Sequence, residues 1–218
     1  MTQSVLDLPV YAPGVVAVRE HPDVVRLQGM LEGLAEVTGD PGQVGAMADS
    51  HPVEELRRLE EIKAAAAAAQ ARVTVAFEAS QLARQEAAGV RREQRGRGIG
   101  DQVALARGVP ASQGSRHLGF AKAMAEMPHT LALLTAGRID ERTATLLVRA
   151  TAALSLADRT LVDQRLCAMR IDTATGLVDH PWVLEKTPRR VEGAARALAA
   201  ELDPQAAVRR AAGLPPPV

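Results

Sequence analysis

The sequence has no asparagine, one cysteine and very few aromatic residues, and each shortage excludes a class of structure or chemistry. A catalytic centre that requires an Asn side chain cannot be built from this chain. Cys167 has no second cysteine with which to form a disulfide, which is typical of a reducing compartment. Aromatic residues make up only 2% of the chain, so strands, which favour them, are poorly supported.

Long hydrophobic runs are missing as well. No uninterrupted apolar stretch approaches the roughly 20 residues that a transmembrane helix needs. The N-terminal residues MTQSVLDLPVYAPG are too polar and too rich in proline for a secretory signal. We therefore expect a cytoplasmic protein that does not associate with a membrane.

Alanine supplies much of the apolar content, which amounts to 47% of the 218 residues. Because Ala is the strongest helix former, the composition favours an all-α protein whose helices pack closely. We expect a multi-helix bundle of about eight helices with no convincing strand. Asp140, Ser155 and Thr187 are the expected N-caps of three of these helices.

Breaks rich in glycine and proline divide the chain into three parts. Residues 1–48 are expected to form an irregular arm and a first helix, which starts at Pro22 and ends near Val37. Residues 49–212 are expected to form the helical domain, and residues 213–218 a disordered tail.

One long alanine-rich helix is expected to begin near Asp49 and Ser50. Apolar and small residues recur along it at alternating spacings of three and four, at Leu59, Ile62, Ala66, Ala69, Val73, Ala76, Ser80, Ala83, Ala87 and Val90. This heptad seam predicts a closely approaching partner helix. We favour packing inside the bundle, with a homodimer through the long helix as the alternative.

Opposite charges are concentrated in different parts of the chain, although the net charge is zero. Residues 1–62 contain 4 Lys and Arg against 11 Asp and Glu, whereas residues 63–125 contain 10 against 4. The basic segment indicates a polyanion as partner. Ion pairing between the acidic and basic segments within the fold explains the distribution equally well.

The segment GDQVALARGVPASQGSRHLGFA, residues 100–121, resembles a helix-turn-helix, whose second helix can enter the major groove of DNA. Ala104 and Gly108 have the spacing of that motif, and polar residues crowd the start of the second helix. The predicted DNA contacts are Arg97, Arg107, Ala111, Ser112, Gln113, Ser115 and Arg116. Arg107, Gly114 and His117 depart from the motif, because they occupy positions that are usually apolar.

Catalytic and metal-binding patterns are weak. No two of the five histidines have the i, i+4 spacing that places both on one face of a helix for a metal. Cys167 is expected to be a buried small hydrophobe. The residues indicate no cofactor, no metal and no small-molecule substrate, and we expect the chain not to be an enzyme.

The segments RHLGFAKAMAEMPHTL and ELDPQAAV, within a similarity from about Val73 to Ala211, resemble the domain of unknown function 222. That family implies an all-helical region that precedes an HNH endonuclease domain in high-GC Gram-positive bacteria. The nuclease requires a His-Asn-His set that binds a divalent metal, and this chain has no Asn. Related proteins continue into the nuclease after the segment that resembles DPQAAVRR, so we expect a truncated or free-standing accessory part.

Together these observations predict a non-catalytic helical accessory domain of an HNH-endonuclease-type protein, with double-stranded DNA as partner. The alternative prediction is a protein-interaction or oligomerisation module without DNA contact.

Overall fold

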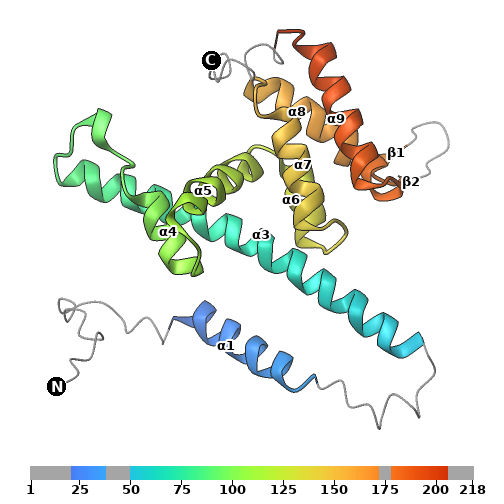
Figure 1. The fold of residues 1–218 in the computed structure, drawn as a ribbon, viewed down its shortest axis with the longest axis horizontal. Coiled ribbons are helices and arrows are strands. Elements are labelled where there is room, and N and C mark those ends of the chain that lie inside the picture. The colour runs from blue at the N-terminus through green and yellow to red at the C-terminus, as the bar shows by residue number, and fades with distance from the viewer. Residues whose placement is uncertain (1–20, 38–49, 172–177, 206–218) are drawn as a thin grey trace. The chain divides into compact units, whose positions relative to one another are not determined.

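The computed structural model describes residues 21–37, 50–171 and 178–205, and it confirms the all-α fold class (Figure 1). The helices are α1 (Pro22–Ala35), α3 (Ser50–Ala87), α4 (Ile99–Arg107), α5 (Ala111–Ala125), α6 (Pro128–Thr135), α7 (Glu141–Thr151), α8 (Leu156–Cys167) and α9 (Pro188–Leu202), with 3-10 turns η2 (Arg92–Gln94) and η3 (Trp182–Glu185). The expected irregular arm over residues 1–20 and the expected tail over residues 213–218 lie outside the described residues.

A short pair of strands departs from the expectation of no strand. β1 (Arg170–Ile171) and β2 (Val178–Asp179) pair antiparallel, with Arg170 opposite Asp179 and Ile171 opposite Val178. Each strand has two residues, which is too short for the alternating pattern that reveals strands in a sequence.

The chain divides into two compact units, Met1–Val53 and Glu54–Val218, with the boundary in the first turn of α3. In the first unit, α1 begins at Pro22 as predicted, and His21 caps it by accepting the backbone N–H of Asp23 at 3.2 Å. None of the residues of α1 is buried, and most of its apolar side chains, among them Val25 and Leu31, are exposed.

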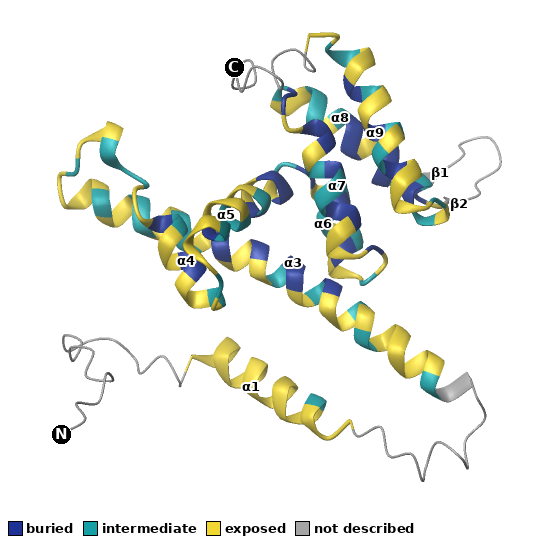
Figure 2. Ribbon diagram, in the orientation of Figure 1, coloured by how far each residue is buried: buried dark blue, intermediate teal, exposed yellow. Residues whose placement is uncertain are grey.

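In the second unit, α3 buries a face made almost entirely of alanine (Figure 2). Ala64, Ala67, Ala68 and Ala71 belong to the core, together with residues of the helices from α5 to α9. The predicted seam is therefore wrong as the internal packing face. Positions i and i+2 of a helix are about 200° apart around its axis. Val73, which is 68% exposed, therefore lies almost opposite Ala71.

The other helices of this unit bury larger side chains. Met124, Leu134, Leu147 and Val162 are completely buried at the centre of the core. α9 packs on α7 and α8, and it buries Val191, Ala195 and Ala199 on one stripe. None of the described helices combines the length and apolar content that would be needed to cross a bilayer.

Two of the three predicted N-caps make the expected hydrogen bond. Asp140 Oδ1 accepts the N–H of Thr143 at 2.7 Å, and Ser155 Oγ accepts the N–H of Asp158 at 3.2 Å. The side chain of Thr187 makes no capping hydrogen bond, although α9 begins directly after it.

The start of α6 is capped by a residue that the sequence did not indicate. The fully buried side chain of Asp163, on α8, accepts the backbone N–H groups of His129 and Thr130 at 2.9 and 2.8 Å. It also accepts the hydroxyl of Thr130 at 2.5 Å. The same hydroxyl lies 3.3 Å from Sγ of Cys167, which is buried as expected. Burial raises the pKa of Cys167 to about 12, so its thiol is a poor nucleophile.

Replacing Asp163 by Ala is expected to lower the free energy of unfolding by about 2–4 kcal/mol, because it leaves buried N–H groups of α6 without an acceptor. Asp140→Ala, which removes a single capping bond at an exposed residue, should cost only about 1 kcal/mol. Urea unfolding followed by circular dichroism measures both. Equal losses in the two variants would contradict the capping role of Asp163.

Candidate nucleic-acid interface

The predicted helix-turn-helix corner is formed by α4 and α5 (Figure 1). α4 ends at Gly108, whose φ of +64° is the left-handed conformation that favours glycine. The N–H groups of Gly108 and Val109 donate to the carbonyl oxygens of Leu105 and Ala104 at 3.1 and 3.0 Å, which closes the turn. α5 then starts at Ala111, directly after Pro110.

The two helices cross at a pair of glycines. A Cβ atom on Gly114 would lie 1.9 Å from the carbonyl oxygen of Gly100 and 2.8 Å from Cβ of Ala104. This contact explains why Gly114 departs from the motif, since a larger anchoring residue has no room. The apolar anchors of the corner lie on α4 instead, where Ile99 and Val103 are buried.

The predicted DNA contacts do not all face the same way. Ala111, Ser112, Ser115 and Arg116 are exposed on α5, and Arg97 is exposed in the loop before α4. Arg107 and Gln113 are half-buried. The exposed residues of α5 also include Gly119, Lys122 and Ala125, so the exposed side of the helix carries small side chains, one arginine and Lys122, which is bound to Glu78 at 3.1 Å.

The segment from Arg91 to Arg116, which contains this corner, carries several arginines without an ion pair. Among the described residues, no carboxylate forms an ion pair with the arginines at positions Arg91, Arg92, Arg97, Arg107 and Arg116. Arg95 differs, because it binds Glu86 at 2.7 Å and donates to the carbonyl of Val90 at 3.0 Å. It therefore holds the loop, while its neighbours keep their charge available.

Positive charge around the corner also affects His117. Burial lowers the pKa of His117, and the nearby Arg107 and Arg116 lower it further, against an opposing contribution from Glu141. The imidazole is therefore neutral at pH 7 and is not part of the positive surface.

A cleft of about 720 Å³ separates α5 from α7. Its lining includes Arg116, His117 and Phe120 from α5 and Thr145, Val148 and Arg149 from α7. No pattern in the sequence indicates this cleft, because its walls come from helices that are separated along the chain. Gln113 also lines the cleft, which separates it from the exposed residues of α5.

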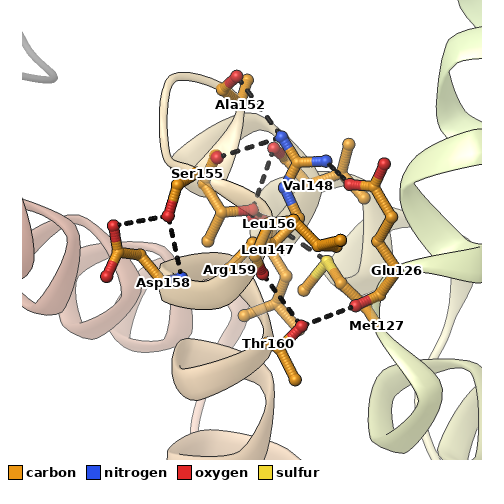
Figure 3. A network of polar contacts seen from close by, with 11 residues as sticks. Glu126, Met127, Leu147, Val148, Ala152, Ser155, Leu156, Asp158, Arg159 and Thr160 are labelled. Carbon is orange, nitrogen blue, oxygen red and sulfur yellow. Dashed lines mark hydrogen bonds and ion pairs between the residues drawn. The ribbon is translucent and has the colours of Figure 1, made fainter. Parts of the chain in front are cut away.

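Arg159 of α8 also lines the cleft, and its polar contacts join three helices (Figure 3). Its guanidinium forms an ion pair with Glu126, which follows α5, and it donates to the carbonyl oxygens of Thr151 and Ala152 at 3.4 Å each. The Arg159 Nε atom is buried and has no hydrogen-bond partner among the described residues. This arginine connects the ends of α5 and α7 to α8.

The described residues contain no group of three or more His, Cys, Asp or Glu side chains that could hold a metal ion. No family model, no curated protein and no solved structure matches this chain.

Gly114→Ala is expected to lower the stability of the domain by at least about 2 kcal/mol, since its methyl group would overlap the backbone of Gly100. Gly119→Ala is the matched control on the same helix, where no atom lies within 4 Å of the new methyl group. It should raise stability by up to about 1 kcal/mol. Thermal unfolding of both variants tests the contact, and a neutral Gly114→Ala would refute it.

Proposed function

We propose that this chain is a non-catalytic, DNA-associated helical domain that places the start of α5 in the major groove of duplex DNA. The proposal rests on one observation: α5 has an exposed side, and the same part of the chain carries arginines that form no ion pair. Serine hydroxyls at Ser112 and Ser115 can contact base edges, and a guanidinium such as that of Arg116 can bind guanine with two hydrogen bonds.

The remaining arginines suit phosphate binding, which needs positive charge and reach rather than a fixed shape. Arg97 and Arg107 come from the loop before α4 and from the end of α4, so both precede the start of α5 along the chain. Small side chains at Ala111 and Gly119 would allow the helix to approach the bases closely.

A more specific proposal rests on the sequence alone, on the expected resemblance of RHLGFAKAMAEMPHTL and ELDPQAAV to the domain of unknown function 222, which no family model supports. In it, this domain acts as an accessory to an HNH endonuclease and contributes DNA association, while the metal-dependent cleavage belongs to the nuclease.

Arg97→Gln and Arg107→Gln are each expected to weaken duplex binding and to reduce the slope of log K against log salt by about 0.9, the value for one lost phosphate contact. With Arg91, Arg92, Arg97 and Arg107 as the phosphate contacts, the wild-type slope should be roughly −3.6. Fluorescence anisotropy across a salt titration measures these slopes.

Arg196→Gln on α9 is the matched control, because Arg196 is already paired with Glu192 at 2.5 Å. It should leave both the affinity and the slope unchanged. Absence of duplex binding at low salt, or an equal effect of all three substitutions, would contradict the proposal.

The exposed seam of α3 favours a second candidate function, an oligomerisation module. Val73 is 68% exposed and Ile62 is 36% exposed, and the seam keeps the heptad spacing that pairs one helix with another. A second copy of the chain could cover it without using the corner.

Val73→Glu is expected to dissociate such a dimer, because it introduces a charge at the centre of an apolar contact. Light scattering at rising protein concentration and at two salt concentrations measures the mass. Leu156→Glu on α8, at a residue that is 60% exposed outside the seam, is the control and should leave the mass unchanged. A wild-type monomer at the highest concentration would exclude the dimer.

A further inference from the structure

The cleft between α5 and α7 has a volume typical of small-ligand sites, about 720 Å³. Both walls supply apolar surface, with Phe120 on α5 and Val148 on α7. Polar groups reach it from the same two walls, as Gln113 on α5 and Thr145 on α7. Such a combination of apolar walls and a few polar groups is the usual design of a ligand site.

The charges in the cleft favour an anion. Arg116 and Arg149 line it from opposite walls, and neither forms an ion pair with any residue that the structure describes. Two other cations of the lining, Lys122 and Arg159, are already bound to Glu78 and Glu126. The lining contains two acidic residues, of which Glu126 is bound to Arg159. Glu141 forms no ion pair with any described residue, so the cleft contains two unpaired arginines and one unpaired carboxylate.

Phe120 indicates an aromatic ligand. The sequence has only two phenylalanines, and Phe120 is a half-buried side chain that both lines the cleft and packs against the core. Stacking on an aromatic ring, with an arginine nearby, is how proteins hold single nucleotide bases without regard to sequence. A base between Phe120 and Val148 would leave its phosphate within reach of the cleft arginines.

We propose that the cleft between α5 and α7 binds one nucleoside phosphate, with the base against Phe120 and Val148 and the phosphate on Arg116 and Arg149. This site goes beyond duplex binding by the exposed side of α5. It shares only Arg116 and Gln113 with the residues predicted from the helix-turn-helix motif.

Calorimetric titration of the full chain with 2′-deoxyadenosine 5′-monophosphate tests the site, with 2-deoxyribose 5-phosphate and inorganic phosphate as ligands that lack the base. Saturable binding of the nucleotide that exceeds binding of both phosphates is expected. Phe120→Leu should weaken nucleotide binding by at least about fivefold and leave binding of deoxyribose phosphate unchanged. A purely structural role of Phe120 would not change this ratio.

Phe77→Leu is the matched control, because Phe77 is the other phenylalanine and lies on α3, away from the lining. Arg149→Gln should weaken binding of both the nucleotide and deoxyribose phosphate, whereas Arg138→Gln, outside the cleft, should affect neither. Circular dichroism confirms that each variant folds, and Arg149, being exposed, provides a test that does not disturb the core.

Equal binding of nucleotide and inorganic phosphate, or no saturable binding at millimolar nucleotide, would overturn the proposal. A short single-stranded oligodeoxyadenylate distinguishes the source of the nucleotide. If the oligonucleotide binds more tightly than the mononucleotide, and Phe120→Leu weakens that binding, the ligand is a base within a strand. If the mononucleotide binds more tightly, the ligand is a free nucleotide. The duplex proposal fails separately, since Arg97→Gln acts on duplex binding alone and Arg149→Gln on nucleotide binding alone.

Discussion

The close contact of α4 with α5 at Gly100 and Gly114 is the constraint on which the corner depends. A methyl group at Gly114 would lie 1.9 Å from the carbonyl oxygen of Gly100, so the two backbones meet without side chains between them. Small side chains also allow close packing on α3, where alanines form the buried face. Bulky residues such as Met124 and Leu147 then fill the centre of the core, where the remaining helices meet.

This packing gives α5 three distinct sides. Gly114, Ala121 and Met124 face the interior, and Gln113 and Phe120 line the cleft toward α7. The third side is exposed and carries Ser112, Ser115 and Gly119. Arg116 borders both the exposed side and the cleft, so a duplex and a nucleotide would compete for it. Arg159, which also lines the cleft, connects the ends of α5 and α7 to α8.

Local signals in the sequence predicted local structure well. Pro22, Asp140 and Ser155 mark the starts of their helices, because capping and proline geometry involve residues only two or three positions apart. The heptad seam failed for the opposite reason. In a helix where alanine occurs on every side, a regular spacing fits several faces, and only tertiary contacts select Ala64, Ala68 and Ala71 as the buried one.

In the candidate site, too, local features could be predicted from the sequence and features that depend on tertiary contacts could not. Ser112, Ser115 and Arg116 are exposed, as a helix that enters a groove requires, but Gln113, which the motif assigns to the same surface, is half-buried and lines the cleft. The departure at Gly114 had no explanation until its contact with Gly100 was known. Neither the cleft nor the role of Asp163 could be predicted, since each depends on side chains from helices that are far apart in the sequence.

Hydrogen exchange of backbone amides, with and without duplex DNA at low salt, shows whether the start of α5 enters the major groove. The first amides of α5 have no partner within their own helix, so they exchange rapidly unless a ligand covers them. If α5 enters the groove, exchange should slow from Ala111 to Arg116 and around Arg97, and it should remain unchanged in α9. Unchanged exchange in α5 with bound duplex, or protection confined to α9, would contradict the account.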